Sequence, residues 1–258
     1  MLDRTRTARR VAVAALAGML LTGGGFAPPA RPDVPAPARP DRAETTAPVL
    51  AFDFSGAPAG QSGSTWRTGC FGNIGSAGGS GCITVDGDGA LRPAGDRALR
   101  FPHTDGGKAV ILFPHTASVN PGTADFQLTA RIAVTGEGVT PNSNVIQKGL
   151  FDTPGGQWKL QTDRGVPSCR IAGIRDGAPV NALAFATESI ADDGPVPVRC
   201  ARRDGRLLLT VGDRVYVSPD DATMDITNTC PVTLGGKGVG AGNDQWHGEL
   251  SGVAFAVG

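Results

Sequence analysis

The nine residues from Phe126 to Val134 read FQLTARIAV and show the clearest periodic pattern in this chain of 258 residues. Every second residue, from Phe126 through Leu128 to Val134, is apolar, while Gln127 and Arg131 lie between them. Successive side chains of a strand point to opposite faces of a sheet. The alternation therefore predicts a strand with one buried face.

Short apolar runs of the same kind, separated by turn residues, recur after residue 47, where helix-forming patterns are nearly absent. This spacing predicts an all-β sandwich or barrel. Asp204-Gly205 lies between two runs and predicts a tight hairpin turn. Besides 126–134, the predicted strands cover residues 49–54, 97–101, 109–113, 144–148, 157–162, 168–174, 196–203, 206–211, 214–217, 231–236 and 249–257, with a weaker one at 180–186.

The first and last predicted strands have the same apolar character. We expect residues 49–54 to pair with residues 250–257, because pairing the two ends would cover both terminal edges of the sheet.

The first residues have the pattern of a secretory signal peptide. Four arginines precede the apolar run Val11–Leu21, and small residues follow it. We predict a signal peptide at 1–27, with cleavage after Ala27 or, alternatively, after Ala30. Residues 28–47 are rich in Pro and Ala and predict a disordered linker, so that the folded domain covers 48–258.

The charge balance argues against a nucleic-acid ligand. The chain has 24 basic and 24 acidic residues, and no basic stripe occurs in the sequence. No later apolar run is long enough to span a membrane as a helix. Together these patterns predict a secreted, extracellular protein without a membrane span.

Seven segments occur in a characteristic order in the C-terminal half: DFQLTA at 125–130, VIQKG at 145–149, QWKL at 157–160, VPVRCAR at 196–202, DGRLLLTVGD at 204–213, VTLGGK at 232–237 and WHGELSGV at 246–253. This order resembles the laminin-G-like and concanavalin-A-like lectin/glucanase domains. The resemblance implies a two-sheet antiparallel β-sandwich of the jelly-roll type with roughly 12 to 14 strands. Val196-Pro197 departs from the family pattern, which has Trp-His there.

The chain has five cysteines. Cys70 and Cys82 flank the Gly-rich segment 72–81, which we interpret as a flexible loop, and their closeness in sequence predicts a disulfide. The resemblance implies a second disulfide between Cys169 and Cys200. That pairing requires segment 180–186 not to lie between them in one sheet, because cysteines two strands apart are about 9–10 Å apart. Cys230 is left over, either as a free thiol or as the site of an intermolecular bridge.

The pattern of acidic residues predicts that the protein is not an enzyme. Glycoside hydrolases need two carboxylates at a fixed separation, which the glucanases of this fold supply as Glu-x-Asp-x-x-Glu. None of the four glutamates, Glu44, Glu137, Glu188 and Glu249, begins such a motif. A Gly-x-Ser-x-Gly nucleophile elbow followed by a helix is also absent.

We predict no cofactor. The resemblance leaves calcium possible through the oxygen ligands of Asp192-Asp193, Asp220-Asp221 with Asp225, or Asn243-Asp244, although we prefer to interpret each as a solvated turn. His103 and His115 share the setting Phe-Pro-His-Thr, which suggests either a metal pair or two similar strand ends.

The three tryptophans are candidates for stacking on a sugar. Trp158 and Trp246 occupy strand positions that the resembled family fills with core aromatics, so the resemblance implies that both are in the core. Trp66 remains as a surface candidate. The loops 135–144, 188–195 and 237–245 are the expected binding rim.

We therefore predict a secreted, non-catalytic recognition module for a glycan or a protein surface, with binding residues not yet assigned. The alternatives are a glycan-active enzyme with a degenerate site and a structural protein linked through Cys230.

Overall fold

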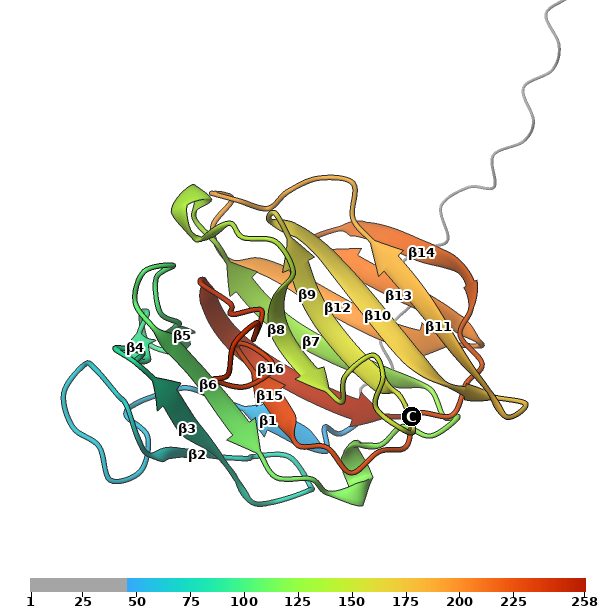
Figure 1. Ribbon diagram of the computed structural model, residues 1–258, viewed down its shortest axis with the longest axis horizontal. Helices are drawn as coiled ribbons and strands as arrows, with labels where there is room; N and C mark the ends of the chain where they lie inside the picture. The colour runs from blue at the N-terminus through green and yellow to red at the C-terminus, as the bar shows by residue number, and fades with distance from the viewer. Residues whose placement is uncertain (1–45) are drawn as a thin grey trace, which may run out of the picture. The chain divides into compact units, whose positions relative to one another are not determined.

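The computed structural model describes residues 46–258, which form two antiparallel sheets of eight strands each. The predicted signal peptide and nearly all of the predicted linker lie outside the described residues. Figure 1 shows β8–β11 in one layer and β7, β12 and β13 in the layer behind it. The fold is thus the predicted all-β sandwich.

The strands of sheet A, in spatial order, are β14 (Arg214–Asp221), β13 (Arg206–Val211), β12 (Val196–Arg203), β7 (Phe126–Ala133), β16 (Glu249–Val257), β5 (Ala98–Arg100) and β4 (Arg92–Pro93), with β1 (Leu50–Phe52) also paired to β16. The strands of sheet B are β11 (Ala178–Phe185), β10 (Val166–Arg175), β9 (Gln157–Asp163), β8 (Ser143–Lys148), β15 (Val232–Leu234), β6 (Lys108–Phe113), β3 (Ser80–Asp86) and β2 (Cys70–Gly72). Two 3-10 turns, η1 (Ala117–Val119) and η2 (Gly136–Gly138), lie in connecting loops.

Strand β7 confirms the alternation from which the prediction started. Phe126, Leu128 and Ile132 are buried in the core, and Gln127 and Arg131 face outward. The strand lies between β12 and β16, so both of its backbone edges are paired. No helix in the described part of the chain is long and apolar enough to cross a membrane.

The two ends of the domain pair as predicted, with Leu50 opposite Phe255. The reason differs from the one expected, because β16 is an interior strand and not an edge. One side of β16 pairs with β7, and the other pairs first with β5 and then with β1. Gly252, with a φ of 57°, lies between those two pairings, where the register to β7 also shifts.

The Asp204-Gly205 hairpin turn is confirmed, with positive φ values of 48° and 71° that suit a type I′ turn. Three strands were missed by the sequence analysis: β2, β3 and β4. As a result the structure has sixteen strands, more than the resemblance implied. The Gly-rich segment 72–81 proves to connect β2 to β3 and contributes to both.

An aromatic stack joins the two sheets. Trp158 on β9 and Phe255 on β16 have ring centroids 4.5 Å apart and planes only 11° from parallel. The indole Nε1 of Trp158 donates to the carbonyl of Val119 at 3.1 Å, so its polar atom is satisfied within the core. Trp246 is also buried, as predicted.

The prediction for Trp66 was wrong. Its side chain is only 3% exposed and packs edge-on against Phe71, and its Nε1 donates to the carbonyl of Gly63. It therefore offers no surface for stacking on a sugar.

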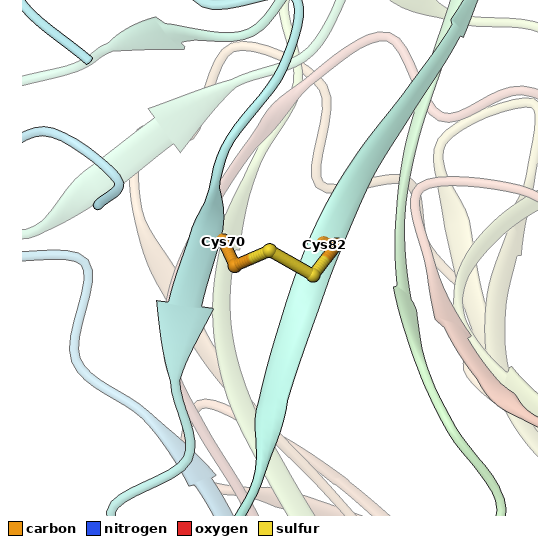
Figure 2. The surroundings of a disulfide bond; sticks show 2 residues. All are labelled: Cys70 and Cys82. Carbon is orange, nitrogen blue, oxygen red and sulfur yellow. A yellow bond between two sulfur atoms is a disulfide. The ribbon is translucent and has the colours of Figure 1, made fainter. Parts of the chain in front are cut away.

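The structure contains the disulfides Cys70–Cys82 and Cys169–Cys200. The first links the adjacent strands β2 and β3 (Figure 2). The second joins β10 in sheet B to β12 in sheet A, with Cα atoms 5.4 Å apart. The segment 180–186 falls in β11 at the edge of sheet B, so it does not separate the two cysteines. Cys230 is a free, half-buried thiol.

Replacing Trp158 by Ala is expected to lower the free energy of unfolding by about 3–5 kcal/mol, because it leaves a cavity between the sheets and removes the stack on Phe255. Replacement by Phe should cost less, since a ring is kept. Urea denaturation followed by far-ultraviolet circular dichroism measures both values. A loss below about 1 kcal/mol for the alanine variant would show that the stack does not hold the sheets together.

Candidate functional site

The outer face of sheet B has a row of polar side chains that crosses four strands. The register places Thr233 opposite Gln147, Gln147 opposite Lys159, and Lys159 opposite Arg170. Residues directly opposite on neighbouring strands point to the same face of a sheet. The alternate residues, such as Leu160, point into the core. The row therefore follows from the same alternation that builds the sandwich.

Most of these side chains are buried although they point away from the core. Gln147 is 3% exposed, Lys159 8% and Thr233 4%. The segments 150–152 and 237–244 border a cavity of about 400 Å³ on this face. We call this cavity the polar hollow; it is lined by Asn142, Gln147, Leu150, Phe151, Asp152, Gln157, Lys159, Gln161, Arg170, Lys237 and Asp244.

A chain of polar contacts fixes one wall of the polar hollow. Lys237 Nζ pairs with Asp244 Oδ2 at 2.5 Å. Asn144 Nδ2 donates to the same carboxylate at 3.4 Å, and the Asn144 backbone N–H donates to the Asp244 carbonyl at 2.9 Å. Lys159 Nζ donates to Asn144 Oδ1 at 3.4 Å, longer than the roughly 2.7–3.2 Å of an ordinary bond. The contacts thus position Lys159 but give its ammonium only one long hydrogen bond.

Burial lowers the pKa of Lys159 from 10.5 to about 8, because desolvation disfavours the charged form. The positive charges of Arg170 and Lys237 lower this pKa further, and Asp244 raises it. Burial also lowers the pKa of Arg170. The Arg170 guanidinium lies 4.4 Å from the centre of the Phe151 ring, a cation–π contact.

Several polar atoms of this face have no protein partner within residues 46–258. They are Gln161 Oε1 and Arg170 Nε in the polar hollow, and Thr233 Oγ1 beside Gln147 in the polar row. A buried polar group without a hydrogen bond destabilises the folded state by about 1–3 kcal/mol. Each of these atoms also has almost no exposed surface, so it can bond to an incoming polar group only when its side chain moves.

The polar hollow contains two carboxylates. Its two carboxylates are Asp152, on an exposed loop, and Asp244, whose charge is paired with Lys237. Acid–base cleavage of a glycoside needs one carboxyl group to donate a proton while the other acts on the opposite side. In the polar hollow one of the two carboxylates, Asp244, already contacts a lysine.

A second cavity, of about 610 Å³, lies on the outer face of sheet A and contains Glu137 and Glu249. Glu249 pairs with Arg100 at 2.5 Å, and the Glu137 side chain is 84% exposed and lies 3.6 Å from His103. Both carboxyl groups therefore contact a basic side chain of the same cavity.

The two histidines of this second cavity differ in environment. His103 is exposed and contacts Asp105 Oδ1 at 2.8 Å, and this hydrogen bond raises its pKa. His247 is partly buried, and burial lowers its pKa. His115, which shares the Phe-Pro-His-Thr motif with His103, is exposed just after the end of β6.

Three of the candidate calcium ligands contact other groups of the protein. Asp192 accepts from the Gly136 N–H at 3.0 Å, Asp221 pairs with Arg175 at 2.7 Å, and Asp225 accepts from Thr227 at 2.7 Å. Within residues 46–258 the structure has no cluster of three or more His, Cys, Asp or Glu residues arranged to hold a metal ion.

The predicted rim loops lie at two different places. Residues from 237–245 border the polar hollow together with Asn142 of the 135–144 loop. Thr135 and Glu137 of that loop instead line the second cavity with residues from 188–195. The polar side chains on the outer face of sheet B were not among the predicted site residues. A usable pattern was present: Gln157, Lys159 and Gln161 alternate with core residues, which places three long polar groups on one face.

No family model matches this chain, and no curated protein matches it in sequence. Solved structures match in fold. They include the binding domain of Paraclostridial Mosquitocidal Protein 1 (TM-score 0.55, 12% identity) and that of botulinum neurotoxin DC, described in complex with rat synaptotagmin II (0.53, 8%). Another is the binding domain of botulinum neurotoxin serotype G (0.52, 8%). Each match covers 81% of this chain but about half of the other chain, 47–48%.

Replacing Lys159 by Met is expected to raise the free energy of unfolding at neutral pH by about 1–3 kcal/mol, because it removes a buried ammonium without a carboxylate partner. The folded-state pKa of Lys159, about 8, lies below its ordinary 10.5, so the unfolded state binds more protons between these values. Wild-type stability should therefore rise as the pH increases from about 8 toward 10.5. The variant should show a smaller rise.

Urea denaturation at pH values on both sides of this range measures the two effects. Lys148, with a pKa also near 8, accounts for the rise that remains in the variant. A variant that is less stable than the wild type at neutral pH would show that the ammonium is adequately solvated in the folded protein.

Proposed function

We propose that this protein is an extracellular, non-catalytic recognition module that binds a glycan or a protein surface through the polar hollow on sheet B. The observation that carries the proposal is the set of buried, outward-pointing polar side chains whose hydrogen-bonding atoms are incompletely used by the protein. Gln161 Oε1 and Arg170 Nε are the clearest cases. A ligand that bonds to them removes a cost that the folded chain otherwise bears.

The surroundings of these atoms support a binding role. The floor of the polar hollow lies on β8, β9 and β10, interior strands of sheet B that hold its side chains in fixed positions. Phe151 at its border is 60% exposed, so one ring face is available for a ligand. Rigid placement of donors and an aromatic surface are typical of small-ligand sites.

The solved structures of similar fold are described as binding domains, which supports recognition over catalysis. The predicted signal peptide at 1–27 and the two disulfides support an oxidising, extracellular location. Membership of the laminin-G-like or concanavalin-A-like group stays a prediction from the segment order.

Replacing Gln161 and Arg170 together by Ala is expected to weaken ligand binding at least about tenfold, because two hydrogen-bonding groups of the polar hollow are lost. Glycan arrays and pull-downs from cell-wall and extracellular protein extracts, using the purified chain, measure the binding. Arg214→Ala is the matched control, since this exposed arginine pairs with Glu188 in a different part of the domain. Equal binding by the double variant and the control would show that the binding site does not lie in the polar hollow on sheet B.

A further inference from the structure

Lys159 and Arg170 place two positive charges side by side in the polar hollow. They are directly opposite each other on β9 and β10, and both line the cavity. Lys159 is 8% exposed, and Arg170 is partly buried. Like charges opposite each other in a sheet destabilise it. The arrangement therefore costs free energy in the absence of a negative partner.

Within residues 46–258 neither cation has a carboxylate partner. The ion pairs of the described chain include neither Lys159 nor Arg170, and Asp244 is already paired with Lys237 at 2.5 Å. Asp152, the other acidic residue of the polar hollow, lies on an exposed loop. The lining has three cations and two carboxylates, so the cavity keeps a net positive charge next to the buried Lys159 and the partly buried Arg170.

We infer that the polar hollow binds the anionic group of an acidic glycan, with Lys159 and Arg170 as a clamp on its carboxylate or sulfate oxygens. This inference rests on the proposed function and specifies its ligand class. An anion bonded to both cations supplies the missing counter-charge, and hydrogen bonds of this kind are about twice as strong as neutral ones. Arg170 Nε, which lacks a protein partner, is one of the donors.

The structure favours a glycan over an acidic peptide. An extended peptide commonly binds by pairing with a free sheet edge. The strands β8, β9 and β10 under the polar hollow are each paired on both sides, so their backbone groups are already used. The side chains that remain are the amides of Gln147, Gln157 and Gln161, which can both donate to and accept from hydroxyl groups.

The ammonium of Lys159 is also the titrating group of the clamp. It faces Arg170 on β10 and the pair Lys237 and Asp244 on the 237–244 segment. Its pKa near 8 means that it loses its charge as the pH rises above that value, and the affinity for an anion should fall accordingly. Lys148 titrates in the same range but points to the opposite, core side of sheet B.

The test is calorimetric binding of the purified chain to four probes: oligogalacturonate, a sulfated heparin oligosaccharide, a neutral cello-oligosaccharide and poly-glutamate. We expect at least one acidic glycan to bind about tenfold or more tightly than the neutral one. Lys159→Met should remove most of this preference. Lys159→Arg should keep the preference and abolish the loss of affinity above pH 8, because arginine stays charged.

The outcomes separate the inference from the proposed function. Tighter binding of galacturonate than of the heparin fragment identifies the anion as a carboxylate, and the reverse identifies a sulfate. Neutral oligosaccharide binding that depends on Gln161 and not on Lys159 would overturn the inference and leave the proposed function standing. Binding of poly-glutamate alone would overturn the glycan assignment. Absence of binding to all four probes would overturn the inference; the arrays and pull-downs decide the proposed function separately.

Discussion

Strand β9 is the element on which both the core and the candidate site depend. Its residues alternate, so that Trp158 and Leu160 enter the core while Lys159 and Gln161 enter the polar hollow. A register slip of one residue would exchange these sets, placing an ammonium in the core and an indole on the surface. The stack of Trp158 on Phe255 therefore fixes the site as firmly as it fixes the sandwich.

The sequence predicted those parts of the fold that depend on local alternation. Residues 126–134 and 157–162 proved to be strands at nearly the expected bounds, because each has apolar residues at every second position. Strands β2 and β3 were missed because glycines dilute that pattern, and their position is fixed instead by the Cys70–Cys82 disulfide and by pairing with β6. Trp66 was misplaced because its burial depends on contacts made by a loop.

The candidate site was harder to predict because its members come from distant segments. Lys237 and Gln147 are far apart in sequence, and they line the same cavity because β15, which precedes Lys237, pairs with β8. Acid pairs and metal ligands are recognisable in a sequence by residue type. A cluster of amides and uncompensated cations has no such local pattern and becomes visible only when the register is known.

Lys148 and Lys159 show why a displaced pKa alone does not identify a site. Burial lowers both pKa values to about 8. Lys148 Nζ donates to the carbonyl of Asn228 at 2.8 Å, to Asn228 Oδ1 at 2.7 Å and to the carbonyl of Cys230 at 2.9 Å, so all three of its protons are bonded. Lys159 has a single long contact and a neighbouring cation. A fully bonded ammonium has no free donor, so of the two lysines Lys159 is the candidate for the proposed binding role.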